Sequence, residues 1–176
     1  MPMSRLVRPS EEWREEYIAF YEDWNSSGEK MVPWVIAKEP YSFEEMLQYL
    51  SDGEKETEGL VPHSTYWLID DDNQVVGVVN IRHRLNEKLL LRGGNIGYGI
   101  RPSARRKGHA TRILSLALGI TKAMGLDRAL VTCDRSNEAS ARTIVKNGGK
   151  LDSEYVEDNG NVVLRFWIDL QEEISS

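Results

Sequence analysis

The sequence predicts one α/β domain, in which a mixed sheet carries helices on both faces. Its 176 residues fit a single domain with a real hydrophobic core. Segments with helical and strand periodicity follow one another in the order β-α-α-β-β-β-α-β-α-β-β, an order typical of layered α/β structure. No linker long enough to separate domains interrupts this order. We therefore expect residues 1–176 to form one domain, structured from about residue 4 to residue 170.

The first third of the chain predicts one short strand and two helices. The strand covers residues 6–8, and Ser10 is placed to cap a helix over about 11–24. Aromatic residues repeat along this helix at helical spacing: Trp13, Tyr17, Phe20, Tyr21 and Trp24. Ser42 and Glu45 have the spacing of a capping box, which predicts a second helix to about Leu50. An acidic loop through residue 58 follows it.

The middle of the chain predicts three strands. Residues 64–69 and 75–84 form the first two, joined by the turn at 70–73. A loose connection through Asn86 and Lys88 leads to a third strand over about 95–101. Pro102 ends that strand because it cannot donate to a sheet ladder.

The last 70 residues predict two helices and three strands. An apolar helix covers about 108–124 and ends before Gly125, a typical helix C-cap. A buried strand at 129–132 and a helix at about 137–147 follow. The tail from 150 to 170 carries two strands around Asp158-Asn159-Gly160, a strong hairpin signal. The last strand is expected to be exposed, where it could pair with a second copy in a homodimer.

Composition and charge exclude several classes of function. The chain is 40% apolar and 28% charged, as is ordinary for globular proteins, and its net charge of −6 argues against nucleic-acid binding. No apolar run is long enough to span a bilayer, and no apolar signal core follows Met1. We therefore expect a cytoplasmic protein without a membrane partner. The lone Cys133 can form neither an internal disulfide nor, by itself, a zinc site, so no metal is expected.

Five basic residues and no acidic one stand between positions 101 and 112: Arg101, Arg105, Arg106, Lys107 and Arg112. Alone, such a cluster is typical of a solvated surface turn. Here it lies between a strand and a helix, whose first N–H groups and partial positive charge attract phosphate. Gly108 and Ala110 would let a pyrophosphate approach the backbone. Walker A and dinucleotide motifs both fail, because Gly108 lacks the Lys-Ser/Thr and the further glycines that they need.

The segment Arg105-Arg106-Lys107-Gly108-His109-Ala110 resembles the signature of the GNAT N-acetyltransferase superfamily. In that signature an aliphatic strand ending near Pro precedes Arg/Gln-x-x-Gly-x-Gly/Ala at the start of a long helix. Ile100 and Pro102 stand at the expected offsets. A second block is similar too, with a strand at 131–134, Asn137-Glu138-Ala139-Ser140, and 146–149 ending in Gly148-Gly149. The order of the elements also resembles a GNAT fold.

The resemblance implies acetyl-CoA as cosubstrate and an amine, either a small amine or a peptide N-terminus, as acceptor. Backbone groups of Tyr98, Gly99 and Ile100 would bond the acetyl carbonyl and the pantetheine arm, and Asn137 the pantetheine. The phosphates would be held by the turn and its backbone N–H groups: Arg105, Arg106, Lys107, Gly108, His109, Ala110 and Thr111. The implied reaction is direct attack by the amine on the thioester, without an acyl-enzyme.

The usual catalytic side chains of the family are absent from their usual positions. A Tyr seven residues after the motif Asn, the general acid in many members, is replaced by Ile144. Ser140 is the nearest substitute, similar to the branch that includes ribosomal-protein N-terminal acetyltransferases, although a helical Ser also bonds its own backbone. For the base, His83 is a candidate because its pKa lies near neutrality. His63, Asp134, Glu87 and a water chain remain alternatives.

Other functions stay open at this point. A GNAT-fold domain that binds CoA without catalysis, as a sensor or structural module, is the main alternative, and a nucleotide-dependent phosphotransferase is a weaker one. Cys133 lacks an adjacent base and is expected to be a small buried residue rather than a nucleophile. The aromatic residues between 13 and 34 favour packing over an acceptor pocket. The acidic and aromatic segment 28–63 is where the resemblance implies the acceptor site.

Overall fold

The computed structural model describes residues 3–171 and contains every predicted element in the predicted order. Residues 1–2 and 172–176 of the expected domain lie outside the described part. The strands are β1 (Arg5–Val7), β2 (His63–Ile69), β3 (Val75–Arg82), β4 (Ile96–Ile100), β5 (Arg128–Asp134), β6 (Lys150–Val156) and β7 (Val162–Asp169). The α-helices are α1 (Arg14–Ser27), α2 (Phe43–Asp52), α3 (Glu87–Leu91), α4 (His109–Ala123) and α5 (Glu138–Lys146). Short 3-10 turns are η1 (Glu11–Trp13), η2 (Trp34–Ala37) and η3 (Pro102–Ala104).

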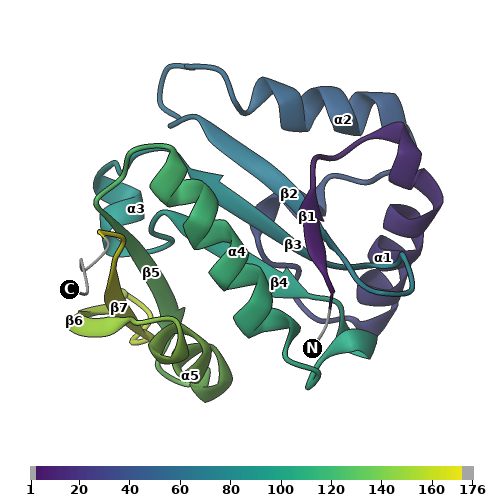
Figure 1. The fold of residues 1–176 in the computed structure, drawn as a ribbon. Coiled ribbons are helices and arrows are strands. Elements are labelled where there is room, and N and C mark those ends of the chain that lie inside the picture. The colour runs from purple at the N-terminus through teal and green to yellow at the C-terminus, as the bar shows by residue number, and fades with distance from the viewer. Residues whose placement is uncertain (1–2, 172–176) are drawn as a thin grey trace, which may run out of the picture.

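The strands form two antiparallel sheets, ordered β1-β2-β3-β4 and β5-β7-β6. The sheets meet at Asn95, whose N–H donates to the Leu130 carbonyl over 2.7 Å. The Asn95 side-chain oxygen accepts in turn from the Leu130 N–H over 2.8 Å. Within residues 3–171 no ladder joins β4 to β5, and the two strands diverge (Figure 1). Beside this divergence, a cavity lies between β4 and the first turns of α4 and α5.

Two hydrophobic clusters hold the layers together. One lies between α4 and the sheets and includes Ile81, Ile113, Val131 and Ile144. The other lies where α1 and α2 cover the opposite face of the four-stranded sheet. In this second cluster the Tyr17 ring stacks on Trp67 with centroids 4.1 Å apart. Buried aromatics contribute large apolar areas, so most of the aromatic series on α1 serves packing, as expected.

Several local expectations were wrong. Ser10 and Ser42 accept no capping hydrogen bond through their side chains. The first helix begins with a tight 3-10 turn, so Ser10 stands before that turn rather than at the start of α1. Ser42 begins α2 through its backbone alone, since its carbonyl accepts from the Met46 N–H over 3.0 Å. The loose connection at 86–88 contains α3, capped by the Asn86 side chain, which accepts from the Leu89 N–H over 2.9 Å. A five-residue helix is too short to show helical periodicity.

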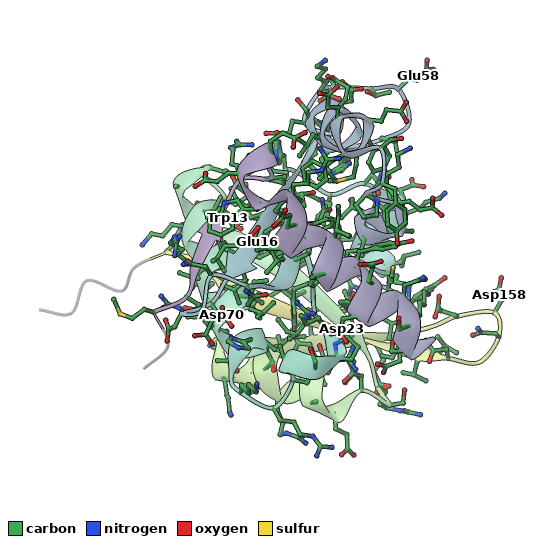
Figure 2. The ribbon with its side chains drawn as sticks, turned by 90° about the vertical axis from the view of Figure 1, so that its right-hand side faces the viewer. Trp13, Glu16, Asp23, Glu58, Asp70 and Asp158 are labelled. Carbon is green, nitrogen blue, oxygen red and sulfur yellow. The ribbon has the colours of Figure 1, made fainter. Side chains whose placement is uncertain are left out.

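The C-terminal hairpin also differs from expectation. The last strand, β7, lies between β5 and β6, so the exposed edge of its sheet is β6. The hairpin closes through Gly160, whose φ of 89° is left-handed, and its tip at Asp158 projects from the molecule (Figure 2). In residues 3–171 no helix has the length and hydropathy to cross a membrane.

Candidate functional site

A cavity of about 540 Å³ opens between β4 and the first turns of α4 and α5. The predicted cofactor residues that line it are Tyr98, Gly99, Ile100, Arg105, Arg106, Gly108, His109, Ala110, Thr111 and Asn137, joined by Ser140. Lys107 and His83 are not among its lining residues. Val32, Arg142 and Thr143 line it as well, and no sequence signal singled them out. Two motifs almost 30 residues apart along the chain thus face one space.

The turn before α4 offers unpaired backbone donors to this cavity. Arg106 and Gly108 both have left-handed backbones, with φ of 63° and 85°. Arg112 is the first helical residue whose N–H bonds to this turn, reaching the Gly108 carbonyl over 3.1 Å, so the N–H groups of 109–111 are available to a ligand. No atom lies within 4 Å of a Cβ placed at Gly108. Free donors, a helix N-terminus and open space together fit the pyrophosphate of CoA.

Most of the basic cluster is engaged by protein groups rather than left for a phosphate. The engaged members are Arg101 with Asp23 at 2.9 Å, Arg105 with Glu29 at 2.9 Å, and Arg112 with the Ser4 carbonyl at 3.0 Å. Figure 2 shows Asp23 on α1, facing this turn. Burial raises the pKa of Asp23, but hydrogen bonds from Arg101 and Ser103 outweigh it and lower the pKa below its usual value. The exposed Arg106 and Lys107 are the cations left at the turn.

The Tyr98 hydroxyl and the Ser140 hydroxyl lie 3.0 Å apart and bridge β4 to α5 inside the cavity. Ser140 therefore bonds across the opening rather than to its own helix. Burial raises the pKa of Tyr98 to about 12, so this phenol holds its proton at neutral pH. Burial also raises the pKa of the half-buried Cys133 thiol beside Ser140 to about 11, which keeps it a poor nucleophile.

Asn137 and Ile144 hold α5 in place. The Asn137 side-chain oxygen accepts from the Ser140 N–H over 3.1 Å and caps the helix. Its amide NH₂ group remains as a donor beside the cavity that Asn137 lines. Ile144 is fully buried in the core between α4 and the sheets. A core side chain therefore occupies the position on α5 where many family members have Tyr.

Three of the candidate bases have hydrogen-bond partners elsewhere, and the fourth, Glu87, stands at the start of α3 and does not line the cavity. The His83 ring nitrogen Nε2 lies 2.7 Å from the Ser64 hydroxyl, and burial lowers the pKa of His83. The His63 ring nitrogen Nδ1 lies 2.8 Å from the Asn80 amide. Asp134 accepts at 2.8 Å from Arg92 and at 2.8 Å from an amide nitrogen of the hairpin. No Asp or Glu is among the residues that line the 540 Å³ cavity.

Glycine at position 99 has a steric cause. A Cβ there would overlap the carbonyl oxygen of Val32 and lie 2.6 Å from the Trp24 ring. The segment before η2 therefore passes directly against β4 at the cavity edge. Glycine within a strand is typical of such a close approach. The Gly-Tyr-Gly of this strand is therefore the sequence feature that could have indicated the contact with Val32.

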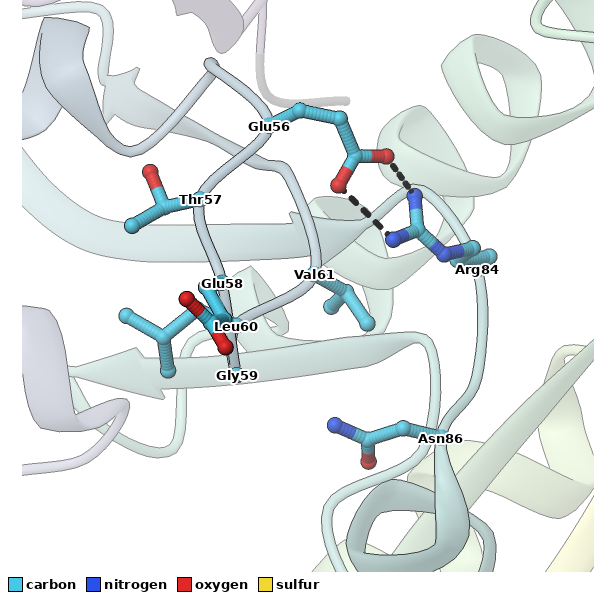
Figure 3. A pocket seen from close by; sticks show the side chains of 8 residues that line it. All are labelled: Glu56, Thr57, Glu58, Gly59, Leu60, Val61, Arg84 and Asn86. Atoms are coloured by element: carbon cyan, nitrogen blue, oxygen red, sulfur yellow. Dashed lines mark hydrogen bonds and ion pairs between the residues drawn. The ribbon is translucent and has the colours of Figure 1, made fainter.

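A second cavity, of about 400 Å³, lies between the loop after α2 and the end of β3 (Figure 3). Arg84 pairs there with both carboxylate oxygens of Glu56, one of them at 2.8 Å. The Glu58 and Leu60 side chains stand on the same loop. This cavity shares no lining residue with the one at α4. Among the described residues no group of three His, Cys, Asp or Glu is placed to hold a metal ion.

Solved structures share this fold at low sequence identity. A ribosomal-protein-S5-alanine acetyltransferase from Vibrio fischeri aligns with TM-score 0.69 at 15% identity, covering 96% of this chain and 93% of the other. The microcin C7 self-immunity acetyltransferase MccE, in complex with acetyl-CoA and AMP, gives 0.67 at 16% identity, with coverages of 94% and 92%. A spermidine N-acetyltransferase chimera from Vibrio cholerae SpeG and hSSAT gives 0.65 at 14%, with 95% of each chain covered.

Comparison with curated proteins yields no match. The family model described as "Acetyltransferase (GNAT) domain" matches residues 5–150, which is most of the chain. That span contains the turn before α4, the Tyr98–Ser140 pair and Asn137. The chain therefore belongs to the GNAT acetyltransferase family, as the resemblance implied, and its enzyme class is that of an N-acetyltransferase.

Proposed function

We propose that this protein transfers an acetyl group from acetyl-CoA to a primary amine, either a small amine or a peptide N-terminus, in the cytoplasm. The observation that carries the proposal is the continuous cavity from the anion-binding turn to the Tyr98–Ser140 hydroxyl pair. One end of this cavity would bind the phosphates of CoA, and the other end presents two hydroxyl groups that could donate a proton. Two proteins of related fold support the acceptor class, since one is a ribosomal-protein-S5-alanine acetyltransferase and the other a spermidine N-acetyltransferase chimera.

The roles of the chain's residues follow from their placement. N–H groups at 109–111, with Arg106 and Lys107, would bind the pyrophosphate, and backbone groups of Tyr98 to Ile100 would orient the pantetheine. Acetyl-CoA supplies an activated thioester. As the amine nitrogen bonds to the acetyl carbon and the carbon–sulfur bond breaks, Ser140, backed by Tyr98, would deliver a proton to the sulfur. The amine would lose its proton to water, because no carboxylate lines the cavity.

The second candidate is a domain that binds CoA without catalysis. The missing carboxylate and the core position of Ile144 favour it. Neither observation removes the Tyr98–Ser140 hydroxyl pair, which is part-buried and lies in the cavity where the thioester would react. We therefore place acetyl transfer first.

Thiol release separates the two candidates. The protein is incubated with acetyl-CoA and a panel of primary amines, and free thiol is followed over time. Acetyl transfer predicts thiol release that depends on at least one amine. CoA binding by calorimetry with no amine-dependent thiol release would support the binding module. A thermal shift with ATP but not with CoA would contradict both.

A further inference from the structure

Arg82, the last residue of β3, is a buried cation without an acidic partner. It is 7% exposed, and its Nη1 donates to the Gly93 carbonyl over 3.0 Å. Its buried Nε has no hydrogen-bond partner among the described residues, and no carboxylate of residues 3–171 forms an ion pair with it. Burial lowers the pKa of Arg82 to about 10, so the side chain is still charged at neutral pH.

An unpaired buried charge is costly, because the guanidinium loses hydration and gains no anion in return. A methionine of similar volume would fill the same space without the cost of burying a charge. Residues that reduce stability in this way are typical of functional sites, where a ligand completes the pairing. The Gly93 carbonyl takes a donor of Nη1 and Nε is enclosed, so Nη2, without a hydrogen-bond partner among the described residues, is the group left for such a ligand.

The guanidinium lies beside the place where an acceptor would meet the cofactor. A Cβ at Gly97 would be 2.9 Å from Nη1 and 3.0 Å from Nη2 of Arg82, so the group lies directly over that glycine. Gly97 and Gly99 share one face of β4, and Tyr98 points to the other. Gly99 lines the cofactor cavity. Arg82 itself does not line the cavity: it contacts β4 at Gly97, two residues before Gly99, on the face where Val32 and Trp24 approach the strand.

The neighbours of Arg82 on this face are polar but uncharged. The buried Asn80 side-chain oxygen, two residues back on β3, has no hydrogen-bond partner in the described chain. His63, opposite Arg82 in the β2–β3 register, has its pKa lowered by burial and then by the charge of Arg82. The Trp34 ring meets His63 edge-on at 5.3 Å and is 46% exposed. The acidic charge that acts on His63 is that of Glu54, which pairs with Arg8 over 2.9 Å.

We propose that Arg82 binds the carboxylate of the acceptor, so that the acceptor is an amino acid: an amine that also carries an acid group. This inference rests on the proposed acetyl transfer. The carboxylate would take the free donors of Arg82, and the amine would then lie along β4 toward the cavity. A planar guanidinium binds carboxylates through paired hydrogen bonds, which also fix the orientation of the ligand.

The test compares free L-amino acids with the corresponding L-amino acid amides, which differ only in the acid group. Thiol release gives KM and kcat for both series, and calorimetry on the CoA-loaded protein gives binding. The expected result is a KM roughly 10-fold or more lower for acids than for their amides. Arg82→Met should raise KM for acids about 10- to 100-fold, leave amides unchanged and so abolish the preference. Arg82→Lys should retain part of it.

Arg84→Met is the matched control, since Arg84 lies two residues further on and pairs with an exposed Glu56. It should leave the acid preference intact. Amides used as well as acids, or an Arg82→Met variant that impairs both series equally, would overturn the role of Arg82 and leave acetyl transfer standing. Acid binding that depends on Arg82, without thiol release from any acceptor, would instead contradict acetyl transfer. Absence of acid-selective binding and of acid-selective turnover would overturn the inference.

Discussion

The Tyr98 hydroxyl lies 3.0 Å from the Ser140 hydroxyl, and this contact joins strand β4 to helix α5. Ser140 alone is a weak acid. The hydrogen bond to Tyr98 would let Ser140 give its proton to the leaving sulfur while it takes the proton of the phenol. In the proposed mechanism Tyr98 would supply the phenol from β4, because the family's usual tyrosine position on α5 holds the buried Ile144.

Tyr98→Phe is therefore expected to lower kcat by about 10- to 100-fold, the range of general acid catalysis. KM for acetyl-CoA should change little, because the phenol acts on the leaving sulfur rather than on binding. Ser140→Ala should have a similar effect. The double variant should be little worse than either single one, since both changes break the same relay. Steady-state kinetics by thiol release provide the measurement.

Tyr155→Phe, on β6 and outside the cavity lining, serves as the control and should leave kcat unchanged. Additive losses in the double variant would show that the two hydroxyls act separately. A Tyr98→Phe enzyme with full kcat would rule out the phenol as proton source.

Gly108 tests the anion-binding turn. Gly108→Trp should weaken CoA binding by 100-fold or more in calorimetry, because the indole would fill the open space before α4. Gly108→Ala is the matched control for backbone strain: its φ of 85° should cost about 1 kcal/mol of stability with only a small loss of affinity. A Gly108→Trp variant that binds CoA like the wild type would contradict the pyrophosphate assignment.

Local patterns predicted the order of the elements and the turn before α4, because strand alternation, helical spacing and glycines act over a few residues. Partners distant in the chain were not predictable. Arg105 pairs with Glu29, 76 residues away, and Arg112 bonds Ser4, 108 residues away. The basic cluster therefore marked a turn that lines the cavity, although most of its charge is paired within the protein.

The site's chemistry depended on the same kind of distant contact. Tyr98 was expected to act through its backbone, and nothing local in the sequence shows that its hydroxyl reaches Ser140, 42 residues away. Arg82 gave no local signal either, since a basic residue at the end of a strand is usually exposed. Its burial follows from Gly97 and Gly93 on the neighbouring chain segment.

The pKa of Tyr98 makes a prediction for alkaline pH. Tyrosine titrates near 10 in the unfolded chain and near 12 at this position, so the folded state keeps its proton longer. Its contribution is present below pH 10 and is lost as the pH rises toward 12. Tyr98→Phe should thus show a shallower fall in unfolding free energy over this window, by up to about 2 kcal/mol. Urea denaturation at several pH values measures it, and parallel curves would contradict the raised pKa.

His83 provides a test of the base. His83→Gln is expected to leave kcat within about 3-fold of wild type, because His83 bonds Ser64 and does not line the cavity. The change removes one part-buried hydrogen bond and should cost about 1 kcal/mol of stability. Thiol release between pH 6 and 9 measures the effect. A large loss of kcat, together with loss of the acid limb of the pH profile, would identify His83 as the base.

Asn95 joins the two sheets through its hydrogen bonds to Leu130, and its replacement should affect both stability and cofactor binding. Asn95→Ala leaves the buried Leu130 N–H without an acceptor, which costs about 1–3 kcal/mol. The spacing of β4 and β5 would also no longer be fixed, so we expect KM for acetyl-CoA to rise several-fold with a smaller change in kcat.

Asn25→Ala, at an exposed position on α1, is the control and should change neither stability nor KM. Denaturant unfolding and kinetics on the same preparations separate the two effects. A destabilised Asn95→Ala enzyme with an unchanged KM would mean that the core alone sets the width of the opening.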